Sequence, residues 1–146
     1  MVKQVIVCDD EPHIVRAISL KFTRAGFDVK GISNVESCWR LLQRSDDVPA
    51  VLIVDDSMSS GPDGLELVRR VRSDARLSAL PIVLLTSQSF DLYEYKEQLA
   101  DYDLAQIVPK PFSPRSLLSI VEGFLQPEFA PHAPMFSRFQ KLTVSR

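Results

Sequence analysis

Four apolar runs of the chain end in side chains that could do chemistry. The residues that follow these runs are Asp9, Asp10, Glu11, Asp55, Asp56, Thr86, Ser87 and Lys110. Two carboxylates about 4 Å apart repel each other by about 4 kcal/mol at an effective dielectric constant of about 20, and a divalent cation offsets that repulsion. Oxygen ligands with room for water favour Mg²⁺ over zinc. The hydroxyl and the ammonium would then face an anion bound with the metal, and phosphate is the obvious candidate.

The elements that must position these residues follow from hydrophobic periodicity. Strands are expected at residues 5–8, 27–32, 50–54, 81–85 and 105–108. Helices are expected between them and after the last strand, the least regular of them over about residues 90–101. Five strands that alternate with five helices predict an α/β fold with a doubly wound parallel sheet. In such a sheet all strands end along one edge, where ligands bind, so the residues named above should converge.

Local signals mark several element ends. Pro12 suits the first turn of a helix, and Gly26 suits the cap after its last turn. Ser33 and Glu36 have the spacing of a capping box and predict the start of the second helix. Pro109, at the end of the last apolar run, suits a strand at the edge of the sheet.

Composition limits the class of protein. The chain has 146 residues, 45% of them hydrophobic and 25% charged, which is typical of one soluble globular domain. Its net charge of −2 argues against nucleic acid as a direct partner. The two cysteines are too few for a secreted disulfide scaffold, and no apolar run is long enough for membrane insertion. The N-terminus lacks the pattern of a signal peptide, so we expect a cytoplasmic protein.

The charge is uneven along the chain. Residues 126–146 contain three prolines, three basic residues and one acidic residue, which gives them a net charge of +2 and leaves residues 1–125 at −4. We therefore expect a globular domain over residues 1–125 and a Pro-containing basic extension over residues 126–146, either disordered or serving as a docking segment. The extension is too short for a separate output domain, so the globular domain is expected to stand alone.

Several fragments, in order, resemble the receiver domain of two-component response regulators. They are residues 7–12, residues 49–55 with Met58, and residues 63–67, 81–86 and 110–112, and the resemblance covers about residues 3–125. It implies a flavodoxin-like fold whose five strands lie in the order 2-1-3-4-5. It also implies a phosphoprotein of signal transduction, which switches on a reversible aspartyl phosphate and is not an enzyme that turns over a separate substrate.

The same resemblance implies roles for the acidic residues. A sensor histidine kinase or a histidine phosphotransfer protein would donate a phosphoryl group to Asp55. Asp10 would bind Mg²⁺ directly and Asp9 largely through water. Asp55 and the backbone carbonyl of Ser57 would be further ligands, with Mn²⁺ as the alternative ion. The residues agree with this chemistry, because phosphoryl transfer depends mainly on positioning and charge neutralisation, and a carboxylate can be the nucleophile.

Residues at the neighbouring strand ends would respond to the phosphoryl group. The resemblance implies that Lys110 pairs with its oxygens and that Thr86 moves to hydrogen-bond them. Ser57 and Gln88 stand two residues after the aspartate and the threonine, where the resemblance implies tuning of the dephosphorylation rate. Their other interpretation is as exposed polar residues of loops. A phosphoryl group adds about −1.5 to −2 of charge to an acidic pocket, which would drive a local rearrangement.

The position of the phosphoacceptor has two solutions. The spacing that the family usually has between Gly64 and the phosphoacceptor points to Asp56. Counting forward from Pro49, or back from Met58, points to Asp55, which we favour. Asp56 would then be either a solvated loop carboxylate or a contributor to metal affinity.

One position departs from the family pattern. Ile107 stands three residues before Lys110, where the family often has an aromatic switch residue. Packing in an edge strand is the simpler interpretation of Ile107. Tyr93, Tyr95 and Tyr102 could supply aromatic surface in its place, or could simply be partly buried.

Other functions compete with that of a free-standing switch. The switch would signal through protein contacts or phosphorelay to an unidentified protein, and homodimer formation is left open. The chain could instead be a receiver cut from a hybrid histidine kinase or a larger regulator, or a scaffold that needs no phosphorylation. A haloacid-dehalogenase-type phosphatase needs Asp-x-Asp after its first strand, and a P-loop enzyme needs Gly-x-x-x-x-Gly-Lys. The first strand is followed by no such motif, and the second motif is absent from the sequence.

Overall fold

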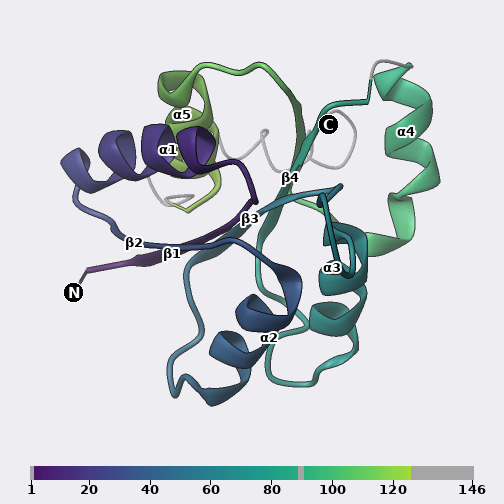
Figure 1. The fold of residues 1–146 in the computed structure, drawn as a ribbon, viewed down its shortest axis with the longest axis horizontal. Coiled ribbons are helices and arrows are strands. Elements are labelled where there is room, and N and C mark those ends of the chain that lie inside the picture. Colours follow the sequence, from purple (N-terminus) through teal and green to yellow (C-terminus); the bar gives the residue numbers. More distant parts are fainter. Residues whose placement is uncertain (1, 89–90, 126–146) are drawn as a thin grey trace, which may run out of the picture.

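Five parallel strands form the centre of the molecule, which the computed structural model describes over residues 2–88 and 91–125. The strands are β1 (Gln4–Cys8), β2 (Asp28–Ile32), β3 (Val51–Asp55), β4 (Ile82–Thr86) and β5 (Gln106–Pro109). They pair in parallel in the order β2-β1-β3-β4-β5 (Figure 1). The predicted doubly wound sheet and its strand order are confirmed.

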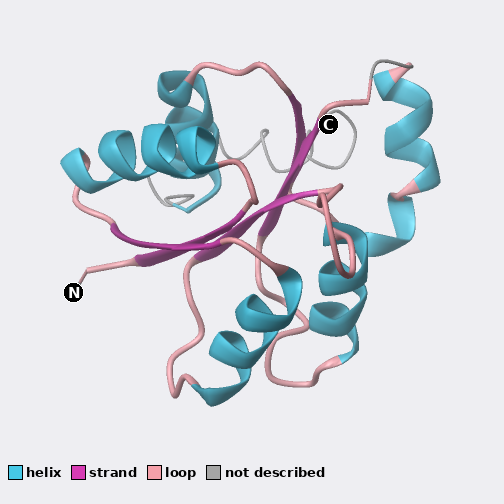
Figure 2. Ribbon diagram, viewed as in Figure 1, coloured by secondary structure: helices cyan, strands magenta, loops and turns pink. Residues whose placement is uncertain are grey.

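Helices connect the strands and cover both faces of the sheet. They are α1 (Pro12–Arg24), α2 (Val35–Arg44), α3 (Gly64–Ser73), α4 (Leu92–Gln98) and α5 (Pro114–Leu125), with a short 3₁₀ helix η1 (Ala100–Tyr102). Figure 2 shows α1 and α5 on one side of the strands and α2 and α3 on the other, with α4 to one side. Because every crossover returns the chain in the same direction, all five strands end along one edge.

The side chains of the strands point alternately into two cores. Val5 and Val7 of β1 belong to the core formed with α1 and α5. Ile6 and Cys8 of the same strand belong to the core formed with α2, α3 and α4. All residues of β3 and β4 are buried. Their continuous apolar sequences therefore reflect helices on both faces of a parallel sheet.

The start of α2 differs from the predicted capping box. Asn34 is the N-cap in place of Ser33, and its side chain accepts a hydrogen bond from the Ser37 amide at 2.8 Å. Glu36 pairs instead with Arg70 of α3, at 3.2 Å. The capping-box prediction was wrong by one residue, because asparagine caps a helix as well as serine does and the glutamate has a partner on the neighbouring helix.

Other element ends follow the sequence more closely. Pro12 begins α1, and Gly26 has a φ of 99° just after that helix, a conformation that favours glycine. Pro109 ends β5, which is an edge strand as predicted. The helix predicted over about 90–101 is shorter, because regular α-helix ends at Gln98 and the chain tightens into η1.

None of the helices in the described residues is long and apolar enough to span a membrane. The predicted extension over residues 126–146 lies outside the described part of the chain. Its interpretation as a disordered or docking segment, and the division at residue 125, therefore stay predictions.

Candidate functional site

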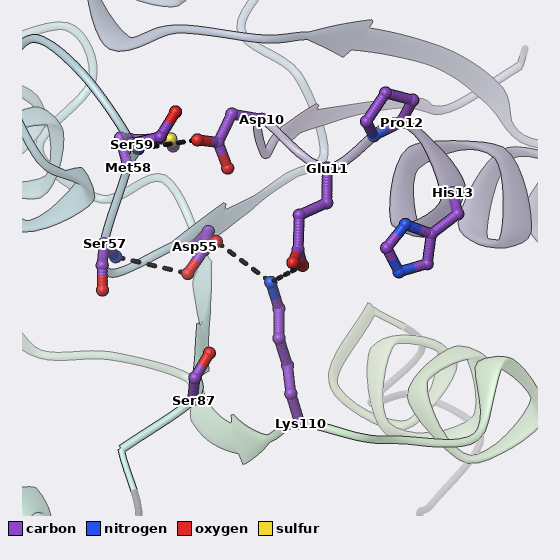
Figure 3. A pocket seen from close by; sticks show the side chains of 10 residues that line it. All are labelled: Asp10, Glu11, Pro12, His13, Asp55, Ser57, Met58, Ser59, Ser87 and Lys110. Carbon is purple, nitrogen blue, oxygen red and sulfur yellow. Dashed lines mark hydrogen bonds and ion pairs between the residues drawn. The ribbon is translucent and has the colours of Figure 1, made fainter.

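Four side chains meet at the carboxyl edge of β1, β3 and β5. Lys110 follows β5, and its Nζ lies 3.0 Å from Asp9 Oδ2. The same Nζ lies 2.9 Å from Glu11 Oε1 and 3.0 Å from Asp55 Oδ2. Figure 3 shows the ammonium reaching the carboxylates of Glu11 and Asp55 across an open pocket of about 570 Å³. The strands cause this convergence, because β1 and β3 lie side by side and Asp9 and Asp55 stand at their ends.

Burial decides the electrostatics of this group. Asp9 and Asp55 are only 1% and 4% exposed. Burial raises the pKa of both carboxyls above the ordinary value of 3.8, and backbone hydrogen bonds together with the nearby Lys110 ammonium oppose that rise only in part. Burial alone would lower the pKa of Lys110, but its contacts with the carboxylates of Glu11, Asp55 and Asp9 raise it above the ordinary value of 10.5. The lysine therefore stays charged at neutral pH and acts as the counter-ion of the pocket.

The same oxygens are suited to a divalent cation. Asp9, Glu11 and Asp55 each offer one carboxylate oxygen, and these oxygens all lie within 4.8 Å of one another. Asp9 Oδ2 is buried and accepts no hydrogen bond of good geometry, although Lys110 Nζ lies 3.0 Å away. A buried oxygen without a well-formed hydrogen bond would be stabilised by a metal ion, and Mg²⁺ prefers a site in which all ligands are oxygen atoms. The described residues therefore fit the magnesium ion that the sequence predicts.

Asp10 and Ser57 flank this cluster. Asp10 Oδ2 accepts a 2.7 Å hydrogen bond from the Ser59 amide, and the interaction with Ser59 lowers the pKa of Asp10. The Ser57 amide donates to Asp55 Oδ1 at 3.2 Å. The structure thus brings Asp9 and Asp55 together with Lys110, whereas Asp10 is held against the loop that follows β3 (Figure 3).

Asp56 contacts a different part of the molecule from its neighbour Asp55. Its carboxylate is 4% exposed, and its Oδ2 accepts a 2.6 Å hydrogen bond from the Tyr95 hydroxyl of α4. Its Oδ1 accepts a 3.3 Å hydrogen bond from the Ser57 hydroxyl. Successive residues of an extended segment face opposite sides of a sheet, which explains the separation. The interpretation of Asp56 as a solvated loop carboxylate is therefore wrong.

Thr86 stands at the end of β4, beside the end of β3. Its side chain is fully buried, and its Oγ1 accepts a 3.1 Å hydrogen bond from the Gln88 amide. Burial and the bond to Asp56 raise the pKa of Tyr95, and an interaction with the Thr86 side chain acts in the opposite direction. Tyr95 therefore remains protonated at neutral pH and can donate. The predicted loop residues Ser57 and Gln88 are both exposed.

The first residue of α3 packs directly against the end of β3. A Cβ atom on Gly64 would lie 1.8 Å from the backbone oxygen of Asp55. The Gly64 amide donates to the backbone oxygen of Asp56 at 3.1 Å. Glycine is therefore required at this close approach. The start of α3 packs against, and is hydrogen-bonded to, the segment that carries both aspartates.

One residue of the site and one residue outside it were not assigned a role from the sequence. Glu11 was seen in the acidic run after the first strand, and that run was the signal that could have identified it. Tyr95 was interpreted as helix packing or aromatic surface. Its partner Asp56 lies 39 positions away in the chain, and nothing local in the sequence indicates the pairing.

The sheet and its edge define the class of protein. A doubly wound α/β sheet of this strand order, with an acidic pocket and a lysine at its carboxyl edge, is suited to hold a cation together with an anion. Comparisons with known proteins agree. The family model described as "Response regulator receiver domain" matches residues 5–122, and the chain belongs to this family, whose members act in two-component signalling.

Individual relatives give the same family. The transcriptional regulatory protein GltR of Pseudomonas aeruginosa is 29% identical over 126 residues, which cover 85% of this chain and 49% of that protein. The alkaline phosphatase synthesis transcriptional regulatory protein PhoP of Bacillus subtilis is 32% identical over 128 residues, covering 86% of this chain and 50% of that protein. The chain thus spans about half the length of the curated relatives it matches.

A solved structure shows the same fold. The chemotaxis response regulator CheY4 of Vibrio cholerae superposes with a TM-score of 0.74 at 24% identity, covering 84% of this chain and 98% of that one. The flavodoxin-like arrangement predicted from the sequence is confirmed.

Proposed function

We propose that this receiver accepts a phosphoryl group on Asp55 in a reaction that depends on Mg²⁺. The observation that carries the proposal is the position of Asp55, whose carboxylate lines the pocket 3.0 Å from the Lys110 ammonium, which in turn lies 3.0 Å from Asp9 Oδ2. The rival residue Asp56 does not line that pocket and is hydrogen-bonded to Tyr95. This difference favours Asp55 as the nucleophile.

The transfer itself needs few groups. A carboxylate oxygen of Asp55 forms a bond to the phosphorus of a phosphohistidine on a sensor histidine kinase or a phosphotransfer protein. The phosphorus–nitrogen bond breaks, and the departing imidazole takes up a proton. Lys110, already charged within the pocket, can exchange part of its pairing with the carboxylates for the new phosphoryl oxygens. That exchange stabilises charge where it develops.

The metal ligands in this proposal are Asp9, Asp10, Asp55 and the backbone carbonyl of Ser57. Bound Mg²⁺ would neutralise charge on the phosphoryl group and on the crowded carboxylates. The buried Asp9 Oδ2, which accepts no hydrogen bond of good geometry, supports this assignment. Glu11 is a further oxygen donor within the cluster.

One residue would respond to the phosphoryl group, and two would set the rate at which it is lost. The Thr86 hydroxyl, buried at the end of β4, turns to hydrogen-bond a phosphoryl oxygen. Ser57 and Gln88 are exposed near the pocket, where they influence the approach of water and hence the rate of dephosphorylation. The receiver then signals in the cytoplasm through contacts with another protein or by phosphorelay.

A second candidate is that this receiver is one part of a longer regulator. It is favoured by the curated relatives, which are named as transcriptional regulatory proteins and are about twice as long as the matched region. In that case the output segment would be attached to the receiver. The chemistry proposed for Asp55 is the same in both candidates.

The proposal is tested with the whole chain and a small acyl phosphate such as acetyl phosphate. With Mg²⁺ present, intact mass spectrometry should show a gain of one phosphoryl group, which hydroxylamine removes because it cleaves acyl phosphates. Chelation of the metal should abolish the gain. A protein that gains no phosphoryl group under any of these conditions would be a scaffold receiver, and the proposal would be rejected.

A further inference from the structure

Helix α4 contacts the body of the protein through Tyr95, with the partly buried Leu92 packed against the same core. Tyr95 is the one residue of α4 that is buried, at 6% exposed, whereas its neighbour Tyr93 is 70% exposed. Figure 1 shows α4 to one side of the sheet, and its buried residue Tyr95 belongs to the same core as residues of α2 and α3. A seven-residue helix is too short to be stable in isolation. Its position therefore depends on the contacts of Tyr95 and of the turn that follows.

The hydroxyl of Tyr95 ends at the phosphoacceptor segment. It donates to Asp56 Oδ2 at 2.6 Å, and Asp56 is the residue directly after Asp55. The backbone of Asp56 is fixed on two sides, because its amide donates to Leu85 of β4 and its carbonyl accepts from Gly64 of α3. A short, buried hydrogen bond to a carboxylate is stronger than a neutral one. It joins α4 to a rigid part of the sheet edge.

Thr86 connects the same tyrosine to the pocket. Its side chain is fully buried at the end of β4 and interacts with Tyr95. If Thr86 turns toward a phosphoryl group on Asp55, it must leave that interaction. Ile107, at the β5 position where the family often has an aromatic side chain, is 5% exposed and has no polar atom that could hydrogen-bond to Thr86. Among the described residues, Tyr95 thus links the Thr86 side chain to α4, whereas Thr86 contacts the end of β5 through its backbone, where the Lys110 amide donates to the Thr86 oxygen at 2.7 Å.

We propose that the Tyr95–Asp56 hydrogen bond is the element that couples helix α4 to the phosphorylation site, so that phosphorylation of Asp55 loosens α4. The proposal rests on the proposed function of Asp55 and names the element that responds to it. Tyr95 is a positioning residue: it holds α4 in place in the unphosphorylated protein. When Thr86 turns toward the phosphoryl group, Tyr95 loses its interaction with the Thr86 side chain, the Tyr95–Asp56 hydrogen bond weakens, and the short helix is held less firmly.

Hydrogen–deuterium exchange of residues 91–99 tests this coupling. In the wild-type protein, acetyl phosphate with Mg²⁺ should speed exchange in this segment by about tenfold, the size expected from the loss of one hydrogen bond of this kind. In Tyr95→Phe, exchange should already be fast without phosphate and should change little on phosphorylation. Tyr93→Phe is the matched control, because its hydroxyl lies on the exposed side of the same helix, and it should behave as wild type.

A second variant separates coupling from simple structural support. Asp56→Asn keeps a hydrogen-bond acceptor at the position but removes its charge. Its effect on exchange should not add to that of Tyr95→Phe in the double variant, because both remove one interaction. Additive effects would overturn the proposal, as would a Tyr95→Phe protein whose α4 still responds to phosphorylation as strongly as wild type.

Intact mass measured on the same samples distinguishes the two levels of failure. If wild type and Tyr95→Phe both gain the phosphoryl group but α4 exchange is equal in both, the coupling is wrong and the phosphorylation stands. If neither protein gains the phosphoryl group, the proposed function itself fails. The expected result is normal phosphorylation of both proteins with a phosphorylation-dependent α4 only in the one that retains Tyr95.

Discussion

Lys110 holds together three carboxylates that would otherwise repel one another. Its side chain is 10% exposed, and each of its three contacts is 3.0 Å or shorter. A buried ion pair of this kind adds little net stability, because burial of its charges costs free energy. Removal of one partner is nevertheless strongly destabilising, because it leaves the other charge buried and uncompensated. The same arrangement prepares the pocket for a metal ion and a phosphoryl group, because the metal can pair with the carboxylate oxygens and the phosphoryl group can pair with the Lys110 ammonium.

Replacement of Lys110 tests its role as the counter-ion of the buried carboxylates. Lys110→Met should lower the free energy of unfolding by about 2–4 kcal/mol at neutral pH, because Asp9 and Asp55 lose their counter-ion. Urea denaturation measures the change. Lys96→Met, at an exposed position of α4, is the control and should change stability by less than about 0.5 kcal/mol. Equal losses in the two variants would show that Lys110 is not the counter-ion of the buried carboxylates.

The site residues differ in how far the sequence could predict them. Asp9, Asp55 and Lys110 follow apolar runs, and a parallel sheet must bring the ends of those runs together. The direction of each side chain is not contained in that argument. Asp55 and Asp56 are adjacent in the sequence, yet one faces the pocket and the other faces Tyr95. The spacing from Pro49 and Met58 favours Asp55 as the phosphoacceptor, but only the three-dimensional contacts show that the two side chains have different partners.

At the scale of elements, the caps and close approaches set the geometry of the site. The strands were predictable because β3 and β4 are continuous apolar runs. The start of α2 was not, because Ser33 and Asn34 are adjacent and both are good N-caps. Glu36, which a capping box would use, is paired with Arg70 on another helix.

Substitutions at the start of α2 test whether Asn34, and not Ser33, is the N-cap. Asn34→Ala should destabilise the protein by about 1 kcal/mol, because the Ser37 amide loses its acceptor. Ser33→Ala should have almost no effect. Thermal unfolding of the two variants measures the difference. The opposite order of effects would restore the capping box that the sequence predicted.

Substitution of Gly64 tests the close contact between α3 and β3. Gly64→Ala should destabilise the protein by at least about 1–3 kcal/mol, because its Cβ would overlap the backbone oxygen of Asp55. It should also slow phosphorylation from acetyl phosphate, since α3 and the phosphoacceptor segment must move apart. Gly123→Ala in α5 is the matched control, because a Cβ there meets no atom within 4 Å. It should be neutral or slightly stabilising, and a similar loss in both variants would contradict this account.

At the scale of the whole molecule, the acidic pocket links stability to pH and to metal. The folded-state pKa values of Asp9 and Asp55 are raised above 3.8 by burial, so the folded protein binds more protons than the unfolded chain just above that pH. Without metal, their contribution to stability is fully present below pH 3.8 and is lost as the pH rises through the folded-state values. Mg²⁺ binds the ionised carboxylates and should offset this loss.

The unfolding temperature should therefore respond to Mg²⁺ in a pH-dependent way. Millimolar Mg²⁺ should raise it little in acid and clearly at neutral pH, and Asp9→Asn should reduce the effect. Differential scanning calorimetry with Mg²⁺ or with a chelator measures the shift. A shift that is equal at all pH values would mean that the metal binds elsewhere.

The central claim concerns which of two adjacent aspartates receives the phosphoryl group. The most direct measurement is the intact mass of wild type, Asp55→Asn and Asp56→Asn after incubation with acetyl phosphate and Mg²⁺. The account predicts a gain of one phosphoryl group in wild type and in Asp56→Asn, and none in Asp55→Asn. A phosphoryl group that appears in Asp55→Asn but not in Asp56→Asn would contradict it.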